Sequence, residues 1–285
     1  MTLPPKIGAA PVIKPFGSTP ASTFKLDLTL PTRKEPRPRI VLYAVEGWGK
    51  TSLAAHAPSP IILQAREETG VQRLVDAGSI PIVPCPVIES WPNLLAALDS
   101  LNGGGAQFQT LVLDSIGTFQ RLCVEHVCKT QFDGDFGEHG YSSFGKGAAA
   151  TDREWATMLQ RLDSLNRKGI VVILIGHAKV TTFKNPEGAD YDRYECDADQ
   201  KVWATTKRWA DCVWFGRFDD RSSVTDVKKK GKAIGGADRV LYTRHSAARD
   251  AKPGYSVPEV MTMPDGAAAA WAYVWDLLQS AKESK

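Results

Sequence analysis

Short apolar runs rich in β-branched residues alternate along this chain with stretches of helical length. From residue 39 onward, the apolar runs predict buried strands at 39–45, 60–65, 109–115, 169–177 and 211–218. The longer stretches between them predict helices at 50–57, 91–101, 115–130 and 151–168. Strands that are apolar on both faces and alternate with helices are typical of a parallel sheet covered by helices. We therefore expect an α/β fold with a mostly parallel sheet.

The segments outside this alternation predict projections from the sheet and two distinct ends. Residues 178–198 have β-prone arms around Asn-Pro-Glu-Gly, which predicts a hairpin, and residues 223–243 predict a second one. The glycine-rich segment 133–150 indicates a mobile loop, and the alanine-rich segment 267–285 predicts a terminal helix. Residues 1–37 are rich in proline and lack periodicity, which indicates a tail or peripheral arm. We expect residues 38–285 to form one domain.

A phosphate-binding pattern stands at the end of the first predicted strand. Residues 44–52, AVEGWGKTS, give a small residue, four positions and then Gly-Lys-Thr, with Ala44 in place of the more usual first glycine. Because the backbone N–H groups of such a turn converge on phosphate oxygens, the pattern predicts a site for ATP. The alternative is a glycine turn with a solvated lysine. The expected nucleotide-binding residues are Glu46, Gly47, Trp48, Gly49, Lys50, Thr51 and Ser52.

Two of these residues have specific roles in such a loop, and an acid elsewhere completes the metal site. Lys50 is expected to reach the β- and γ-phosphates, and the Thr51 hydroxyl to bind Mg²⁺. Asp114 ends the apolar strand TLVLD and is the expected second Mg²⁺ ligand. The alternative for Asp114 is a helix N-cap, because a helical stretch follows directly. The next residue is Ser115 and not glutamate, so the catalytic carboxylate has to come from elsewhere.

Several segments together carry a resemblance to a known family. TLVLDSIGTF, VVILIGHAKV, YSSFGKG and RHSAARDAKPGYSVPEV resemble segments of phage nucleotide-binding proteins of the AAA type, which include the RecA-like single-strand annealing ATPases. The resemblance covers about residues 38–262. It implies a RecA-like P-loop core, in which helices flank a twisted, mostly parallel sheet with projecting hairpins. The nucleotide would then lie at the carboxyl ends of the strands.

The resemblance also implies catalytic roles. The general base would follow the second strand, where Glu67 and Glu68 are both candidates. His177, at the tip of the VVILIGH strand, would lie next to the γ-phosphate. The alternative for His177 is a hydrogen-bonded residue at the end of a strand. In RecA-like ATPases a neighbouring subunit supplies a cation to the γ-phosphate. The candidates for this cation are Arg244, Arg249 and Lys252, for which surface salt bridges are the alternative.

The function implied is that of a Mg²⁺-dependent ATPase that acts on single-stranded DNA in phage recombination or replication. The expected partners are single-stranded DNA, further copies of the chain and a phage single-strand-binding protein. A small-molecule or nucleotide kinase is a second hypothesis, although no compact arginine-rich lid is visible. A nucleotide-gated scaffold with little turnover is a third. The residues that could contact DNA through stacking or phosphate pairing are Tyr141, Phe144, Lys146, Lys228, Lys229, Lys230 and Lys232. The alternative for the residues of the glycine-rich loop is that they anchor this loop. The alternative for the lysine run is a solvated loop.

Composition indicates the class of protein and its location in the cell, but it does not indicate the activity. The 285 residues are 43% hydrophobic and 24% charged, as in ordinary globular proteins. A formal net charge of +3 is too small to indicate nucleic-acid binding without local clustering. The five cysteines form no CxxC pair, and no apolar run approaches the roughly 18 residues that span a bilayer. We expect a cytoplasmic protein that does not associate with membranes.

Overall fold

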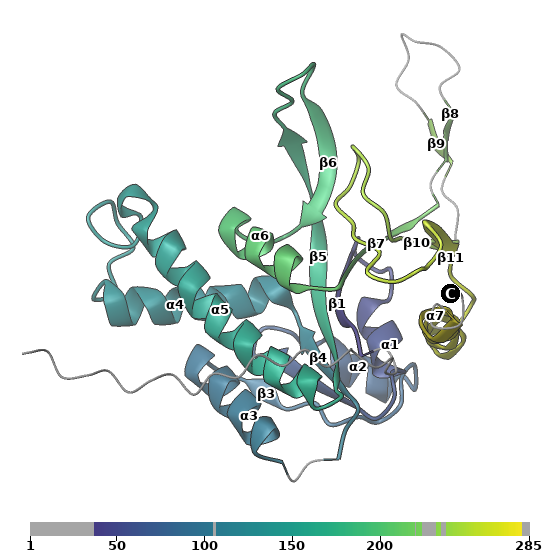
Figure 1. Cartoon of the computed structure of the whole chain (residues 1–285), viewed down its shortest axis with the longest axis horizontal. Coiled ribbons are helices and arrows are strands. Elements are labelled where there is room, and N and C mark those ends of the chain that lie inside the picture. Colours follow the sequence, from purple (N-terminus) through teal and green to yellow (C-terminus); the bar gives the residue numbers. More distant parts are fainter. Residues whose placement is uncertain (1–36, 105–106, 220, 224–231, 235–237, 281–285) are drawn as a thin grey trace, which may run out of the picture. The chain divides into compact units, whose positions relative to one another are not determined.

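The structure is a computed structural model that describes residues 37–104, 107–219, 221–223, 232–234 and 238–280 (Figure 1). Apart from residue 37, the predicted N-terminal tail lies outside the described residues. Within the described part, the strand order of the main sheet is β11-β10-β7-β1-β5-β4-β2-β3, and β6 pairs with the far half of β5. The strands are β1 (Arg39–Ala44), β2 (Pro60–Ala65), β3 (Val87–Ile88), β4 (Thr110–Asp114), β5 (Val171–Phe183), β6 (Tyr191–Cys196), β7 (Cys212–Phe218), β10 (Arg239–Tyr242) and β11 (Val260–Thr262).

The pairing confirms the predicted mostly parallel sheet. The strands from β7 to β3 are all parallel to their neighbours, whereas β6, β10 and β11 pair antiparallel. All five predicted strands are present, and β5 continues past His177 into the predicted hairpin with β6, which projects from the sheet (Figure 1). The second predicted hairpin is shorter than expected. It pairs β8 (Arg221–Ser223) with β9 (Lys232–Ile234), while β10 joins the main sheet.

Helices cover both faces of the sheet, as the two-sided apolar strands require. They are α1 (Lys50–Ala55), α2 (Gly70–Asp76), α3 (Trp91–Gly103), α4 (Ile116–Gln131), α5 (Lys146–Arg167), α6 (Gln200–Trp209) and α7 (Ala267–Ser280). Helices α3, α4, α5 and α6 pack on one face of the sheet, and helices α1, α2 and α7 pack on the opposite face (Figure 1). In β1, Val41 and Tyr43 belong to the first core, and the alternate residues Ile40, Leu42 and Ala44 to the second.

The predicted helices are all present, with one shifted start. Helix α5 begins at Lys146, five residues before the expected position, so it takes up the end of the predicted glycine-rich loop. Helices α2 and α6 and strands β3 and β11 were not predicted, whereas β10 was expected as an arm of the second hairpin. Helix α2 and strands β3 and β11 have seven residues or fewer, so their apolar periodicity is too brief to stand out.

Strand order sets which residues meet at the carboxyl edge. Strand β5 lies between β1 and β4, with Ala44 opposite His177 and Asp114 opposite Ile175. Parallel pairing therefore brings the carboxyl ends of the three strands to the same edge. The loop after β1, His177 and Asp114 come together at this edge. In the sequence, His177 lies 133 residues after Ala44 and 63 residues after Asp114.

Gly216 makes room for a buried tryptophan beneath the loop after β1. A Cβ atom at Gly216 would lie 2.6 Å from the indole ring of Trp48 and 2.9 Å from Ala44 Cβ. We expect Gly216→Ala to lower the free energy of unfolding by about 1–3 kcal/mol, because the core would be overpacked. Urea unfolding measures this change. Gly103→Ala is the matched control, since nothing lies within 4 Å of a Cβ there. Equal stability of the two variants would contradict the packing account.

Candidate functional site

The loop between β1 and α1 has the backbone geometry of a tight phosphate-binding turn. Gly47 and Gly49 have φ values of 72° and 95°, in the left-handed region that glycine adopts without strain. Gly49 is the N-cap of α1, so Lys50 and Thr51 are the first two residues of that helix. The predicted combination of strand, glycine turn and helix is therefore present.

Lys50 is held within the loop and not extended into solvent. Its side chain is only 7% exposed, and Nζ donates hydrogen bonds to the carbonyl oxygens of Ala44 at 3.2 Å and Val45 at 3.3 Å. Burial lowers the pKa of the ammonium group, while the nearby carboxylates of Asp114 and Glu46 oppose this shift. The predicted alternative of a solvated lysine is wrong. Lys50 also lines a cavity.

Thr51 and Asp114 meet across the site. Thr51 Oγ1 donates a hydrogen bond to Asp114 Oδ2 at 2.8 Å, and Asp114 is 6% exposed. Helix α4 is capped by Ser115, whose backbone N–H donates to Thr118 Oγ1 at 3.0 Å. The helix-cap alternative for Asp114 is therefore wrong. A hydroxyl and a carboxylate fit Mg²⁺, which prefers oxygen ligands and takes its others from water and phosphate.

The two candidate bases point in different directions. Glu68 lines the cavity and is half-buried, and its Oε1 accepts a hydrogen bond from Ser115 Oγ at 2.8 Å. Glu67 instead forms an ion pair with Arg121 on the surface. The structure therefore brings Glu68 to the site and leaves Glu67 outside it. Sequence alone could not separate them, because the turn after β2 decides which of two adjacent side chains faces inward.

A cavity of about 340 Å³ joins these groups. His177 belongs to its wall, as predicted, and both burial and the charge of Lys50 lower the pKa of its imidazole. The hydrogen bond that His177 makes at the strand end is through its backbone oxygen, which accepts from Asp197 N at 2.7 Å. The wall consists of Glu46, Gly47, Gly49, Lys50, Thr51, Ser52, Glu68, Gly70, Arg73, Leu74, Asp114 and His177.

The site differs from the prediction at one residue of the loop and at three residues of α2. The Trp48 side chain is fully buried beneath the loop and donates from Nε1 to the Arg217 carbonyl at 3.1 Å, so it anchors the loop and does not line the cavity. Sequence analysis missed Gly70, Arg73 and Leu74 of α2, which do line it. The available signal was the short stretch GVQRLVD, which begins two residues after the second candidate base.

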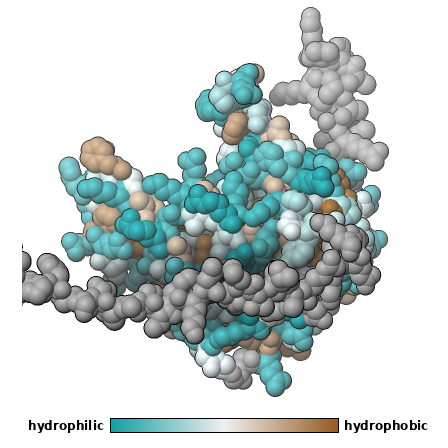
Figure 2. All heavy atoms as spheres, viewed as in Figure 1, coloured by the Kyte–Doolittle hydropathy of each residue, from teal (hydrophilic) through white to brown (hydrophobic). Residues whose placement is uncertain are grey.

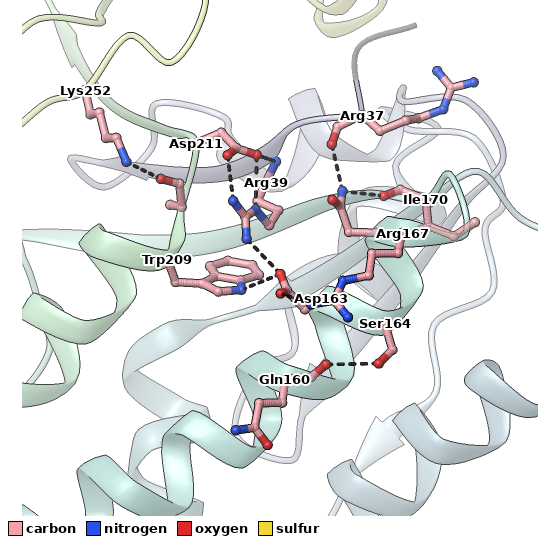
Figure 3. Close-up of polar contacts among 12 residues, drawn as sticks. Arg37, Arg39, Gln160, Asp163, Ser164, Arg167, Ile170, Trp209, Asp211 and Lys252 are labelled. Carbon is pink, nitrogen blue, oxygen red and sulfur yellow. Dashed lines mark hydrogen bonds and ion pairs between the residues drawn. The ribbon is translucent and has the colours of Figure 1, made fainter. Parts of the chain in front are cut away.

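The three candidates for a cation acting on a neighbouring subunit lie in different settings. Arg244 is exposed, and the Arg249 guanidinium stacks on the Tyr242 ring at 3.6 Å. Lys252 Nζ donates to the Ala210 carbonyl at 2.6 Å, near Asp211 and Arg39 at the start of β7 and β1 (Figure 3). This is the amino edge of the sheet, opposite the cavity. Lys252 is thus placed away from the nucleotide edge of its own chain.

The residues predicted to contact DNA also differ in their surroundings. Tyr141 hydrogen-bonds through its hydroxyl to Thr151 Oγ1 at 2.7 Å and packs on Phe132, so it anchors the loop. Phe144 is 99% exposed and Lys146 is exposed beside it. Figure 2 shows hydrophobic atoms standing out over the connection between α4 and α5 on an otherwise largely hydrophilic face. Lys228, Lys229 and Lys230 lie outside the described residues, and only the backbone of Lys232 is described, in β9.

The Asp114 carboxyl predicts how the site responds to pH. Burial raises its pKa to about 6, although the hydrogen bond from Thr51 opposes this shift. We expect the Mg²⁺ dependence of ATP affinity to weaken as the pH falls through about 6, because a protonated carboxyl is a poor metal ligand. Titrations between about pH 5 and about pH 8 measure this dependence. The same profile in Asp114→Asn would contradict the assignment, since only titration of the nucleotide would remain.

Comparisons by sequence and by structure find several proteins that are similar to this chain. Residues 37–254 match the model of a family described as an AAA domain. A stretch of 90 residues is 31% identical to tRNA-cytidine(32) 2-sulfurtransferase from Escherichia fergusonii, but it spans only 30% of this chain and 29% of that protein. An ATPase from the type III secretion system of pathogenic bacteria is similar in structure, with a TM-score of 0.37 and 12% identity over 62% of this chain and 50% of that chain. The flagellar accessory protein FlaH from Methanocaldococcus jannaschii gives a TM-score of 0.39 and 11% identity over 79% of this chain and 84% of that chain.

Among the described residues, no helix is both long and apolar enough to cross a membrane.

Proposed function

Because the chain belongs to the AAA domain family, we propose that it is a Mg²⁺-dependent ATPase that acts on single-stranded DNA. The observation that carries the ATPase part is the meeting of Lys50, Thr51, Asp114 and Glu68 around one cavity. Hydrolysis requires a cation for the phosphates, which Lys50 provides, and oxygen ligands for the metal, which Thr51 and Asp114 provide. It also requires a base that removes a proton from water, which is the role of Glu68. A cavity with only some of them would support nucleotide binding without turnover.

The chain's own residues divide the work of hydrolysis. Lys50 binds the β- and γ-phosphate oxygens and stabilises negative charge where it develops. Thr51 and Asp114 would hold Mg²⁺, which neutralises phosphate oxygens when bound. Glu68 accepts a proton from the attacking water, and the Ser115 hydroxyl fixes its carboxylate. His177, which is held neutral by its lowered pKa, donates a hydrogen bond toward the γ-phosphate.

Two features support single-stranded DNA as the partner. The fully exposed Phe144 ring beside Lys146 suits base stacking together with phosphate pairing. The strand that carries His177 at the cavity continues directly into the projecting β5–β6 hairpin, so a ligand on the hairpin would act on a site residue through one strand. The resemblance to phage annealing ATPases supports a role in phage recombination or replication, with a single-strand-binding protein as a further partner.

We also propose that the chain forms nucleotide-dependent homo-oligomers. Arg244 and Arg249 are then the candidates to act on a neighbour's γ-phosphate, because Lys252 is engaged at the opposite edge. Sedimentation with and without Mg·ATP tests the assembly. An active chain that stays monomeric in both conditions would overturn this part of the proposal.

The experiment for the proposed function is ATP hydrolysis by the full chain with and without a single-stranded oligonucleotide. We expect Mg²⁺-dependent hydrolysis that single strands stimulate more than the matching duplex does. Phe144→Ala should reduce the stimulation and leave the basal rate unchanged. Ile82→Ala is the matched control, because Ile82 is 90% exposed on a different loop. Binding without hydrolysis would favour the nucleotide-gated scaffold, and equal rates with and without DNA would overturn the DNA proposal.

A further inference from the structure

The cavity wall includes an arginine of this same chain, Arg73, that pairs with no other described residue. Arg73 lies on α2, five residues after Glu68, and its exposed side chain forms part of the wall. Within the residues that the structure describes, its guanidinium makes no hydrogen bond or ion pair. An unpaired cation at the mouth of a phosphate-binding cavity is positioned to meet an anionic ligand.

The neighbouring arginines differ from Arg73 in this respect. Arg66 donates to the Glu89 carbonyl at 3.0 Å and pairs with Glu125 at 3.0 Å, and Arg121 pairs with Glu67. Both are committed to the outer surface of this region. The contacts of Arg66 direct it away from the cavity, whose wall does not include it. Arg73 is therefore the arginine that this region offers to a ligand.

The charges around the cavity explain what Arg73 would bind. The wall carries three carboxyl groups, those of Glu46, Glu68 and Asp114, but only two basic side chains that are charged at neutral pH. Lys50 is one of the two, and it is tethered by two carbonyl oxygens. A polyphosphate held by Lys50 alone would face an excess of negative charge. The guanidinium fork of Arg73 suits two phosphate oxygens at once.

We propose that Arg73 binds the polyphosphate of the nucleotide in cis, from the wall of the cavity that Lys50 also lines. This inference rests on the proposed function, since it assigns a further ligand-binding residue to the same site. It also means that phosphate binding does not require a neighbouring subunit. A cation from a neighbour would then affect turnover and not the binding of the nucleotide.

Inorganic tripolyphosphate separates a phosphate contact from a base contact, because it lacks both base and ribose. The experiment measures how well ATP and tripolyphosphate displace a fluorescent ATP analogue from the wild-type chain and from Arg73→Ala. We expect the variant to bind both competitors about 10-fold to 100-fold more weakly, in equal proportion. Arg73→Lys should recover part of the affinity. Arg66→Ala is the matched control, and its affinities should stay unchanged.

Each other outcome overturns the inference in a recognisable way. Weaker ATP binding with unchanged tripolyphosphate binding would assign Arg73 to the base, and unchanged binding of both would give it no ligand. The folding control is simple, because an exposed unpaired side chain contributes little to stability. Failure of the proposed function looks different, since the wild-type chain itself would then bind neither ATP nor tripolyphosphate.

Discussion

Lys50→Ala is expected to leave no detectable ATP turnover, with a loss in kcat on the order of at least 10²–10³. The ammonium group is buried in the loop and oriented by two backbone carbonyl oxygens. In the proposed function it would therefore meet the β- and γ-phosphates already positioned, and no other described residue of the loop can replace its charge. The fold should survive, because burial already disfavours the charged lysine, as its lowered pKa indicates.

The control for this variant is Lys168→Ala. Lys168 is exposed and donates to the Asn102 carbonyl, just before β5 and so at the amino edge of the sheet. Its removal should leave both ATP affinity and turnover at the wild-type level. Hydrolysis and affinity are measured in the same preparations, with circular dichroism as the check on folding. A folded Lys50→Ala chain with wild-type hydrolysis would rule out the phosphate-binding role of the loop.

Glu68→Gln is expected to lower kcat by about 10²–10⁴ and to change ATP affinity by only a few fold. The amide keeps the size of the side chain but cannot accept the proton of the attacking water. Glu67→Gln should behave as wild type, because Glu67 is paired with Arg121 outside the cavity. Single-turnover hydrolysis at saturating ATP distinguishes the two variants.

This comparison has two results that contradict the account. A large loss in Glu67→Gln with normal turnover in Glu68→Gln would reverse the assignment of the base. Normal turnover in both variants would place the base elsewhere in the chain or on a neighbour. The adjacent positions make the pair a strict test, since both substitutions remove one charge from the same turn.

The elements that could be predicted from sequence are those whose signal is local. The strand before the loop, the glycine turn and the placement of Lys50 and Thr51 at a helix start all follow from residues 39–57. The insertion of β5 between β1 and β4 does not, because strand order is a property of the whole sheet. That order is what places His177 and Asp114 at the same edge as the loop.

The residues that were misplaced or missed depend on contacts distant in sequence. Trp48 lies between two glycines of the loop, yet its indole turns into the core because Gly216 on β7 leaves room for it. Tyr141 stands in a glycine-rich segment, but Thr151 and Phe132 hold it in place. Arg73 was missed because a helix of seven residues has too little periodicity to be predicted.

The most direct measurement of the central claim is a calorimetric titration of the full chain with ATP, in Mg²⁺ and in EDTA. The account predicts one saturable site per chain whose affinity depends on Mg²⁺. Asp114→Asn should remove most of this metal dependence, because the hydrogen-bonded pair of Thr51 and Asp114 would no longer offer a charged ligand. Absence of saturable binding would contradict the account, as would binding that is equal in Mg²⁺ and EDTA and unchanged in Asp114→Asn.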